Sequence, residues 1–463
     1  MRQAVFHCHQ VYFQMPPAPV GGDDAVAFPL QPGGGKRLAV LSPFVVHGHT
    51  YFYGQSMTDL QAHQRVIPIT GVVQHYAWGG RVFLPTLLGE KNTDGKPFAE
   101  YWLGVHPASP SALQMAGGRR EPLDRFIARE PQDALGTKVR ERFGGLPYLL
   151  KVLDVAQMLS IQVHPDKKQA REGFAREEAA GIPRDAPHRN YKDDNHKPEL
   201  MIALSEFWLL HGFRPEELVE AVLQETEELS GLLPLFRSGG YKGLYGHLLR
   251  LPQEEVNRIL QPLVDRILPL YRAGQLSKRS PDFWAARAVE TFSPDGNLDR
   301  GLFSIYLFNI VMLRPGEGIF QGAGLPHAYL EGQCVELMAN SDNVLRAGLT
   351  PKHCDVPELL RLVRFEATHP QVWRRKAGTC ATFEAPVDEF QLEHCRVPEG
   401  DKHFFYAEGP SILLVLEGSG MAQEGARSFP VGAGQAFFAL PDAALMISAE
   451  APLSLYTASV PGA

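Results

Sequence analysis

The chain has 463 residues, of which 44% are hydrophobic and 21% are charged. This balance is typical of a protein that folds around a buried core, and the length allows several domains at about 150 residues each. The formal net charge of −7 offers no basic excess to meet nucleic-acid phosphates, so a nucleic-acid partner is not expected. The sequence contains no apolar run of about 18 residues, so no membrane span is expected either.

The five cysteines are odd in number, widely spaced and without a CxxC pair: Cys8, Cys334, Cys354, Cys380 and Cys395. This usage predicts reduced thiols in a cytoplasmic protein rather than a disulfide framework. The N-terminus lacks a basic start followed by an apolar core and a small-residue cleavage site, so no secretory signal is expected.

Residues 1–64 differ in character from the rest of the chain. Proline and glycine clusters interrupt them, and neither a helical nor a strand period persists. We expect a disordered N-terminal extension. His7-Cys8-His9 and His47-Gly48-His49 contain residue types that bind metals. Neither motif has a second half, so both are interpreted as parts of a solvated tail.

Short strands separated by turns dominate the chain on both sides of a helical region. The strands are predicted at the following segments: 66–69, 149–153, 159–164, 303–307 and 309–313. Between them, residues 213–300 read as helical. Pro215-Glu216-Glu217 is a good helix start, because acidic residues near the N-terminus complement the helix dipole. The pattern predicts a mainly β protein with an inserted helical domain.

The longest helical pattern places apolar residues at spacings of three and four from Val256 to Leu268. Such spacing gives a helix one apolar face that packs on a core. Pro262 and Pro269 lie inside the pattern, and proline removes a helical hydrogen bond. A kink or two short helices are therefore expected rather than one straight helix.

A weak internal repeat links residues 315–327 to residues 434–442. Each copy reads as a strand, a glycine turn, a second strand and then Leu-Pro, a rhythm typical of a double-stranded β-helix barrel. The first copy continues with His327 and the second with Asp442. The C-terminal region, 371–463, is therefore expected to form a structural barrel that lacks metal ligands.

The segment from Leu159 to Lys167 carries the first candidate metal ligands. Side chains alternate between the faces of a strand, so Ser160, Gln162 and His164 would point the same way. Three polar groups on one face of an apolar strand suit a hydrated or metal-filled cavity, because a dry core would penalise them. A half-exposed strand with a polar outer face explains the pattern equally well.

Two further candidate ligands lie elsewhere in the chain. Glu199 opens an apolar strand and shares its face with Lys197, and His327 follows a glycine turn. Together with Gln162 and His164 they would give a mixed nitrogen and oxygen site of a kind that zinc accepts. The alternative is that the polar cluster before Glu199 is a surface turn and that each histidine is structural.

The stretch after His327 brings an acid and two cations near the candidate site. Glu336 is the acid, and Arg346 and Lys352 suit an anionic substrate, since arginine offers a planar fork and lysine a point charge. A surface loop with ordinary salt bridges is the alternative. The glycines at 316–318 lack the strand-to-helix context of a phosphate-binding loop.

Several long motifs resemble those of the type I phosphomannose isomerase family, in the family's order, over residues 65–460. The matching motifs are Val73–Gly79, Glu100–Pro107, Leu159–Lys167, Tyr191–Glu199, Pro326–Leu330 and Ser341–Lys352. The resemblance implies a cupin catalytic domain (65–212 and 301–370), an inserted helical domain (213–300) and a C-terminal cupin-like domain (371–463).

The same resemblance implies a role for each candidate residue. One Zn²⁺ per chain would be held by Gln162, His164, Glu199 and His327. Arg346, Lys197 and Glu336 would be catalytic, with the base left open between Glu336, Lys197 and a histidine. Ser160, Lys151 and Lys352 would hold the substrate phosphate, and Trp78 would line the pocket.

The implied reaction interconverts mannose 6-phosphate and fructose 6-phosphate by C1–C2 proton transfer through an enediolate, feeding mannose metabolism and GDP-mannose synthesis. A monomeric cytoplasmic enzyme with this single activity is expected. Two other classes are considered: an iron-dependent cupin oxygenase, which would need a His/His/carboxylate triad without the glutamine, and a non-catalytic sugar-phosphate sensor. Metal content separates the first from the isomerase, and turnover separates the second.

Overall fold

The computed structural model describes residues 43–46, 49–52, 64–374 and 380–463. The chain divides into two compact units, residues 1–59 and 60–463, which are described separately. In the first unit, β1 (Pro43–Val46) and β2 (His49–Phe52) form an antiparallel hairpin. The rest of the extension that was expected to be disordered lies outside the described residues, as do His7-Cys8-His9, His47 and Gly48.

The second unit is built around an eleven-stranded antiparallel sheet. Its main path, in spatial order, is β16 (Trp373–Arg374), β13 (Glu317–Gln321), β10 (Glu199–Ala203), β14 (His327–Ala339), β8 (Tyr148–Val155), β5 (Glu100–Gly104) and β4 (Val72–Gln74). Four more strands branch from it: β9 (Gln162–Val163), β11 (Phe207–Phe213), β12 (Phe308–Leu313) and β15 (Leu345–Arg346). Every residue of β8, β10 and β11 is buried, which explains their nearly unbroken apolar sequences.

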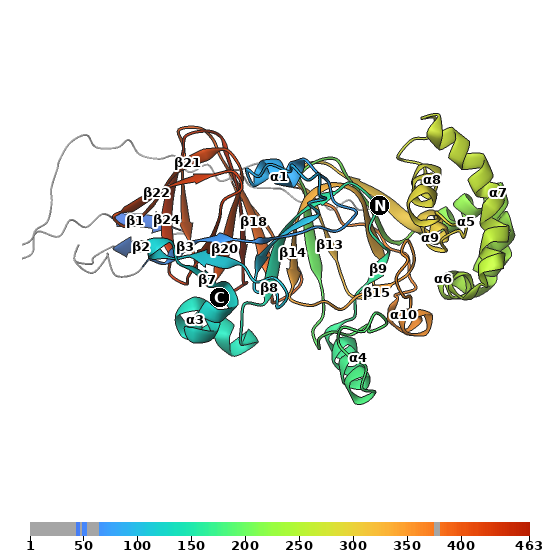
Figure 1. Ribbon diagram of the computed structural model, residues 1–463, viewed down its shortest axis with the longest axis horizontal. Coiled ribbons are helices and arrows are strands. Elements are labelled where there is room, and N and C mark those ends of the chain that lie inside the picture. Colours follow the sequence, from blue (N-terminus) through green and yellow to red (C-terminus); the bar gives the residue numbers. More distant parts are fainter. Residues whose placement is uncertain (1–42, 47–48, 53–63, 375–379) are drawn as a thin grey trace, which may run out of the picture. The chain divides into compact units, whose positions relative to one another are not determined.

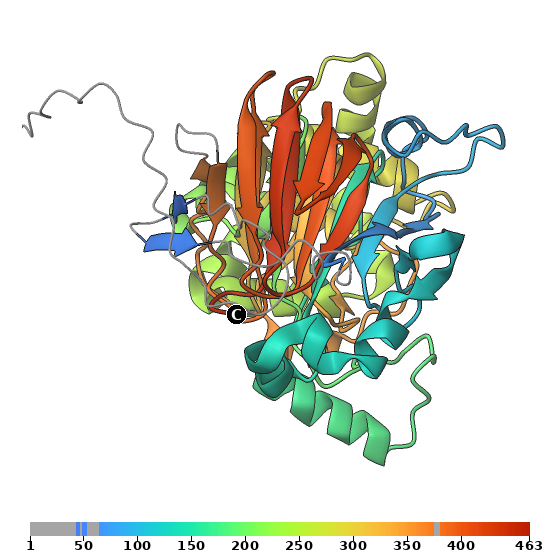
Figure 2. The same ribbon diagram turned by 90° about the vertical axis from the view of Figure 1, so that its left-hand side faces the viewer.

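Two further sheets contain most of the C-terminal strands, which lie side by side in Figure 2. The eight-stranded sheet follows the order β17 (Cys380–Phe383), β18 (Gln391–Val397), β25 (Leu453–Ser459), β20 (Ser411–Glu417), β23 (Ala436–Ala439), β3 (Val66–Thr70), β6 (Ala112–Gln114) and β7 (Arg120–Pro122). The four-stranded sheet contains β19 (Lys402–Tyr406), β24 (Ala444–Ala449), β21 (Ser419–Glu424) and β22 (Arg427–Gly432). β3, near the start of the expected catalytic domain, pairs with β23 and therefore belongs to a sheet made mostly of C-terminal strands.

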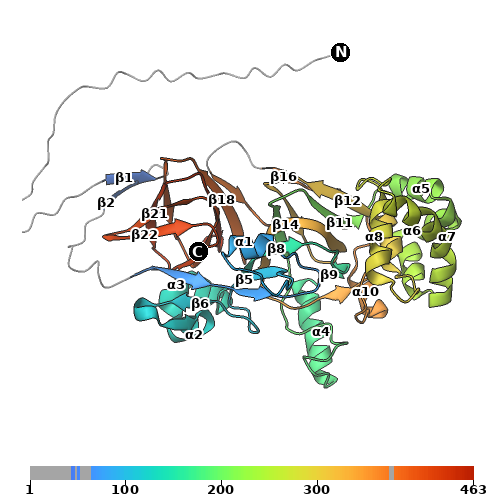
Figure 3. The ribbon, with the colours of Figure 1, turned by 45° about the horizontal axis from the view of Figure 1, so that its top comes forward.

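Five α-helices lie between β11 and β12 in the chain, although these two strands pair with each other. They are α5 (Glu216–Glu225), α6 (Leu233–Arg250), α7 (Gln253–Arg272), α8 (Pro281–Phe292) and α9 (Gly301–Leu307), which form one group in Figures 1 and 3. The remaining helices are α1 (Phe83–Leu87), α2 (Leu123–Arg129), α3 (Pro131–Phe143), α4 (Lys167–Ala179) and α10 (Val356–Leu362). In the described part of the chain, no helix has the length and apolar character that a membrane crossing requires.

Most of the expected elements are confirmed, and three are corrected. Strands 66–69, 149–153 and 309–313 and the helix start at Pro215 are present. The segment 303–307 is helix α9 rather than a strand, because a short, fully buried apolar run fits either structure. Within 159–164 only β9 is regular strand. Helix α7 is continuous through Pro262 and Pro269, so two short helices, one of the two expected outcomes, are wrong, while a kink stays a prediction.

The prediction that all cysteines are reduced is also corrected. Cys380 and Cys395 are opposite each other in the antiparallel pair β17–β18 and are joined by a disulfide. Strand register brings the two sulfurs together, and register could not be derived from the spacing of cysteines along the chain. Cys334 and Cys354 are free thiols.

Candidate metal centre and active site

Three buried side chains from separate segments meet beside the central strand β14. Glu199 opens β10, His327 opens β14, and His164 follows β9 directly. One Glu199 oxygen lies 3.4 Å from His164 Nε2, and the other lies 3.3 Å from His327 Nε2. Their ligand-type atoms all lie within 4.8 Å of one another. The sequence analysis named all three as metal ligands, and the fold brings them together.

The tautomers of the two histidines are fixed by backbone carbonyls. His164 Nδ1 lies 2.8 Å from the oxygen of Asn343, and His327 Nδ1 lies 2.9 Å from the oxygen of Leu325. A carbonyl oxygen can only accept, so each Nδ1 carries the proton and each Nε2 presents a lone pair. Both lone pairs face the Glu199 carboxylate, and His164 Nε2 has no hydrogen-bond partner among the described residues. Three acceptors facing one another need a cation between them.

Protonation of His164 does not supply that positive charge near neutral pH. Burial lowers the pKa of His164 to about 4, so its imidazole is neutral. Burial alone would raise the pKa of Glu199, but His164 and Lys197 hold that pKa well below its usual range. Lys197 Nζ lies 3.5 Å from the carboxylate. Two imidazoles that present their Nε2 atoms and one carboxylate are a ligand set that fits zinc.

Gln162 and Arg346 are placed beside this cluster by strand pairing. In β9, Gln162 is opposite His327 of β14 on one side and Arg346 of β15 on the other. Gln162 is half-buried and lines a cavity of about 50 Å³ with Lys197, Glu199 and His327. Burial lowers the pKa of the half-buried Arg346. Ile161 and Val163 are fully buried, as the alternation in this segment predicted.

The opposite part of the cavity wall is a buried ionic network. Lys151 Nζ lies 3.0 Å from Glu336 and 3.2 Å from Glu100, and Glu336 also accepts a 2.9 Å hydrogen bond from the Tyr329 hydroxyl. Burial alone would lower the pKa of Lys151, but the two carboxylates raise it above its usual range. Burial raises the pKa of Glu336, and the Lys151 charge opposes that rise. Two carboxylates already pair with Lys151, so its expected contact with a phosphate stays an untested prediction.

The other predicted substrate residues lie outside the walls of this cavity. Ser160 is half-buried in the loop before β9, and Trp78 stacks on Tyr76 with ring centroids 5.9 Å apart. Lys352 is exposed. Partial burial, followed by the charges of Arg346 and Lys192, lowers the pKa of Lys352, so three cations face one region. Lys192 was not singled out from the sequence, although it lies in the motif Tyr191–Glu199.

Four more residues at the site were missed by the sequence analysis. Glu100 and Tyr329 belong to matched motifs, but their contacts depend on which strands are neighbours. His211 is opposite His327 in the β11–β14 pair, and its Nδ1 lies 2.9 Å from the Gln321 side-chain oxygen. Burial, followed by the charge of His327, lowers the pKa of His211 to about 4. No local sequence signal distinguishes this buried pair.

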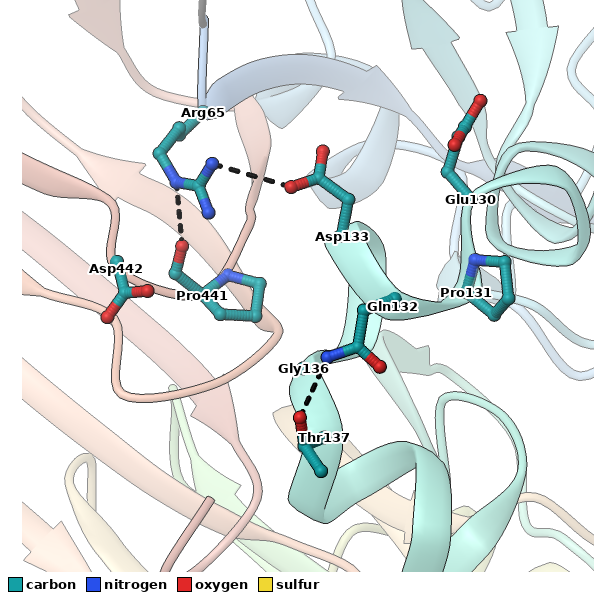
Figure 4. Close-up of a pocket in the computed structure, with 9 residues that line it drawn as sticks. All are labelled: Arg65, Glu130, Pro131, Gln132, Asp133, Gly136, Thr137, Pro441 and Asp442. Carbon is teal, nitrogen blue, oxygen red and sulfur yellow. Dashed lines mark hydrogen bonds and ion pairs between the residues drawn. The ribbon is translucent and has the colours of Figure 1, made fainter.

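A larger hollow of about 450 Å³ lies away from these residues, between α3 and the turn before β24 (Figure 4). Its main cation is already paired: Arg65 contacts Asp133 at 3.5 Å and donates a 2.8 Å hydrogen bond to the oxygen of Pro441. Asp442, the counterpart of His327 in the internal repeat, is exposed here and accepts from the Tyr406 hydroxyl. The hollow is therefore large, but its described residues include neither a cluster of metal ligands nor an unpaired catalytic group.

Glu389 connects the segment before Glu199 to the C-terminal strands, and this contact predicts a pH dependence. It lies 2.8 Å from Lys167 Nζ and 2.9 Å from His196 Nε2. Burial alone would raise the pKa of Glu389, but these partners lower it to about 2. A depressed carboxyl pKa stabilises the fold fully above about pH 4.5, and this stabilisation disappears as the pH falls through about 2.

We therefore expect Glu389→Gln to lower the free energy of unfolding by about 1.5–3 kcal/mol at pH 7, the usual range for a hydrogen bond to a charged group. The difference from the unaltered chain should shrink steadily as the pH falls below about 4.5, which denaturant unfolding at several pH values would measure. Asp388→Asn is the matched control, because the Asp388 side chain is 85% exposed. A loss that does not depend on pH would contradict this account.

Comparison with known proteins identifies the family. The family model "Phosphomannose isomerase type I, catalytic domain" matches residues 66–216, and the C-terminal model of the same family matches residues 383–423. The mannose-6-phosphate isomerase of Salmonella typhimurium is 41% identical over 382 residues, which cover 78% of this chain and 95% of the relative. The chain belongs to the type I phosphomannose isomerase family.

Other members of this family support the assignment. The mannose-6-phosphate isomerase of Escherichia coli is 39% identical over 381 residues, covering 79% of this chain and 92% of the relative. A zinc-bound structure of a mannose 6-phosphate isomerase superposes with a TM-score of 0.76. The Salmonella typhimurium enzyme bound to its substrate, fructose 6-phosphate, and zinc gives 0.77. Both structures are 35% identical to this chain and cover 86% of it and 100% of their own chains.

Proposed function

We propose that this member of the phosphomannose isomerase family is a zinc-dependent enzyme that interconverts mannose 6-phosphate and fructose 6-phosphate. The observation that carries the proposal is the pair of imidazole lone pairs facing the ionised Glu199 carboxylate at the edge of a cavity. Such a cluster needs a cation, and the same cavity contains groups that can move protons. The related Salmonella typhimurium structure that binds zinc and fructose 6-phosphate supports this choice.

His164, Glu199 and His327 would hold one zinc ion per chain, with Gln162 as a fourth ligand from the same cavity. The Nδ1 hydrogen bonds to backbone carbonyls fix the orientation of both rings, as ligating histidines usually require. A bound zinc ion would act as a Lewis acid beside the oxygen on which negative charge develops during proton abstraction. The glutamine ligand distinguishes this set from the His/His/carboxylate triad of iron oxygenases.

Proton transfer between C1 and C2 requires a base for carbon and an acid for oxygen. We assign the base to Glu336, because burial raises its pKa while a carboxylate still accepts a proton near neutral pH. Lys197 lines the same cavity 3.5 Å from Glu199, on the metal side, so we assign it as the acid that serves the substrate oxygen. Arg346 is opposite Gln162 in the neighbouring strand and would orient the sugar and add positive charge.

The substrate phosphate would bind at the cations outside the cavity, where Lys192 and Lys352 lie close to Arg346 and where Ser160 could donate a hydrogen bond. We expect Lys192→Met and Lys352→Met each to raise KM by about 10-fold, because a hydrogen bond to a charged group contributes about 1.5–3 kcal/mol. Values of kcat should change little, since the phosphate does not react. Steady-state kinetics at fixed ionic strength would measure this, and Lys168→Met on the exposed face of α4 is the control. An unchanged KM in both variants would place the phosphate elsewhere.

The division into domains, the oligomeric state and the cellular role are part of the same proposal. We interpret the eleven-stranded sheet as a cupin catalytic domain, the helices between β11 and β12 as its inserted domain and the C-terminal sheets as a cupin-like domain. The internal repeat and the family match support this interpretation. The expected monomeric state, cytoplasmic location, single activity and place in GDP-mannose synthesis stay predictions.

The proposal is tested by a coupled assay of mannose 6-phosphate conversion on the purified full chain. We expect turnover that disappears after chelation and returns with Zn²⁺, together with metal analysis showing zinc rather than iron. Recovery with Fe²⁺ alone would favour the oxygenase class. Folded, zinc-loaded protein that binds the sugar phosphate without turnover would favour the sensor.

A further inference from the structure

A second group of metal-binding side chains lies on the C-terminal strands. Cys395 and Glu393 are two residues apart on β18 and so share a face, and Cys380 is opposite Cys395 on β17. His403 reaches the same point from β19, which belongs to the four-stranded sheet. Ligand-type atoms of all four lie within 4.8 Å of one another. These strands are different from β9, β10 and β14, which build the first site.

These residues lie at the border of a packed core, with Cys395 inside it and Cys380 on the exposed side. Cys395 belongs to a buried apolar cluster that also contains Val397 and Phe405. Val397 is two residues after Cys395 on β18, and Phe405 is two residues after His403 on β19. Cys395 is buried, and Glu393 and His403 are half-buried. Burial raises the pKa of Glu393 and lowers the pKa of His403. The Glu393 and His403 side chains therefore meet the sulfur atoms of Cys395 and Cys380 at the edge of an apolar interior, where polar groups are costly unless they have partners.

The distances in this cluster suit coordination. His403 Nδ1 lies 3.8 Å from Cys380 Sγ, and Glu393 Oε1 lies 3.3 Å from Cys395 Sγ. Ligand atoms around a tetrahedral zinc ion are about 3.3–3.8 Å apart, because Zn–S and Zn–N bonds measure about 2.3 and 2.0 Å. His403 Nε2 is buried without a hydrogen-bond partner among the described residues, so no bond on that side explains the orientation of the ring.

We propose that Cys380, Cys395, His403 and Glu393 form a second binding site for a zinc-type divalent cation, open when the two cysteines are reduced and closed by their disulfide. Binding converts two thiols to thiolates and releases two protons. Closure removes the two thiol protons and two electrons, and a peroxide can accept them, since two thiols and hydrogen peroxide give one disulfide and two waters. The two states exclude each other because the thiolate is the metal ligand and formation of the S–S bond consumes both thiolates.

This site changes the interpretation of the C-terminal region. Asp442, the counterpart of His327 in the internal repeat, is exposed beside a hollow and is not a member of this cluster. The expected absence of metal ligands from residues 371–463 rested on that position alone. The cluster around Cys395 uses other strands and soft sulfur ligands, which favour zinc over calcium or magnesium.

Cobalt binding to the full chain, reduced with a phosphine, tests the proposal. Thiolate ligands give Co²⁺ a ligand-to-metal charge-transfer band in the near ultraviolet, and the first site contains no thiol. We expect this band in the reduced chain. It should be lost in Cys395→Ser, and in His403→Ala it should be weaker and shifted. Cys354→Ser is the matched control and should keep it, because Cys354 lies outside the cluster. Zinc should compete for the same site and erase the band.

Oxidation provides a second readout on the unaltered protein. Hydrogen peroxide should release the cobalt or zinc of this site, seen with cobalt as loss of the charge-transfer band, while isomerase turnover, assayed without chelator and with Zn²⁺ restored, reports that the chain is still folded. A reduced and active chain without the charge-transfer band would overturn the proposal, as would a band that survives in Cys395→Ser. If that variant does not fold, metal release by peroxide from the unaltered chain still decides the question, because retention of the metal would contradict shared sulfur ligands.

Discussion

Glu199→Gln is expected to lower zinc affinity by at least about 100-fold and to reduce turnover in proportion to the zinc lost. The substitution keeps the shape of the side chain and removes its negative charge. Glu199 is the one anionic member of the His164–Glu199–His327 cluster and contacts both Nε2 atoms. A neutral amide would leave the dication without a compensating charge in a buried place, where uncompensated charge is costly.

The measurement is zinc content after dialysis against a graded series of chelator concentrations, with turnover followed on the same samples. Glu206→Gln is the matched control, because Glu206 is exposed, bonds the Trp208 indole and lies outside the cluster. Fold stability should be compared without metal, so that ligand loss is not confused with unfolding. Zinc retention equal to that of the control would remove Glu199 from the metal site.

Lys151→Met is expected to destabilise the fold by about 3–5 kcal/mol, the usual result of removing one partner from a buried ionic network. Lys151 lies 3.0 Å from Glu336 and 3.2 Å from Glu100, and all three side chains are less than a tenth exposed. Without the ammonium group, two buried carboxylates face each other. The same contacts raise the pKa of Lys151 above its usual range after opposing the effect of burial, so the cation stays charged when paired.

Denaturant unfolding of the metal-free protein would measure this loss, with Lys168→Met as the control for an 83% exposed lysine. Adding Glu336→Gln to Lys151→Met should restore part of the stability, because one of the two unpaired carboxylates is removed. The phosphate role predicted for Lys151 leads to a different result: unchanged stability and a raised KM. Stability and KM measured together therefore decide between the two roles.

The elements that depend on local pattern could be predicted from the sequence. Strands 66–69 and 149–153 follow from short apolar runs between turn residues, and the helix after Pro215 follows from its first-turn acids. The segment 303–307 failed this reasoning, because a five-residue apolar run that is buried on all sides has no period to distinguish helix α9 from a strand. The fold class could therefore be predicted from the sequence, whereas the helical structure of residues 303–307 could not.

The residue types of the candidate metal site could be recognised in the sequence, because Gln162, His164, Glu199 and His327 stand in distinctive motifs. The three-dimensional arrangement was needed to find the two carbonyls that turn both Nε2 lone pairs toward Glu199 and the two carboxylates that pair with Lys151. It also decided that Cys380 meets Cys395, against the expectation of reduced thiols. The physical reason is common to all three: these contacts join strands far apart in the chain, and register between such strands is set by the packing of the whole sheet.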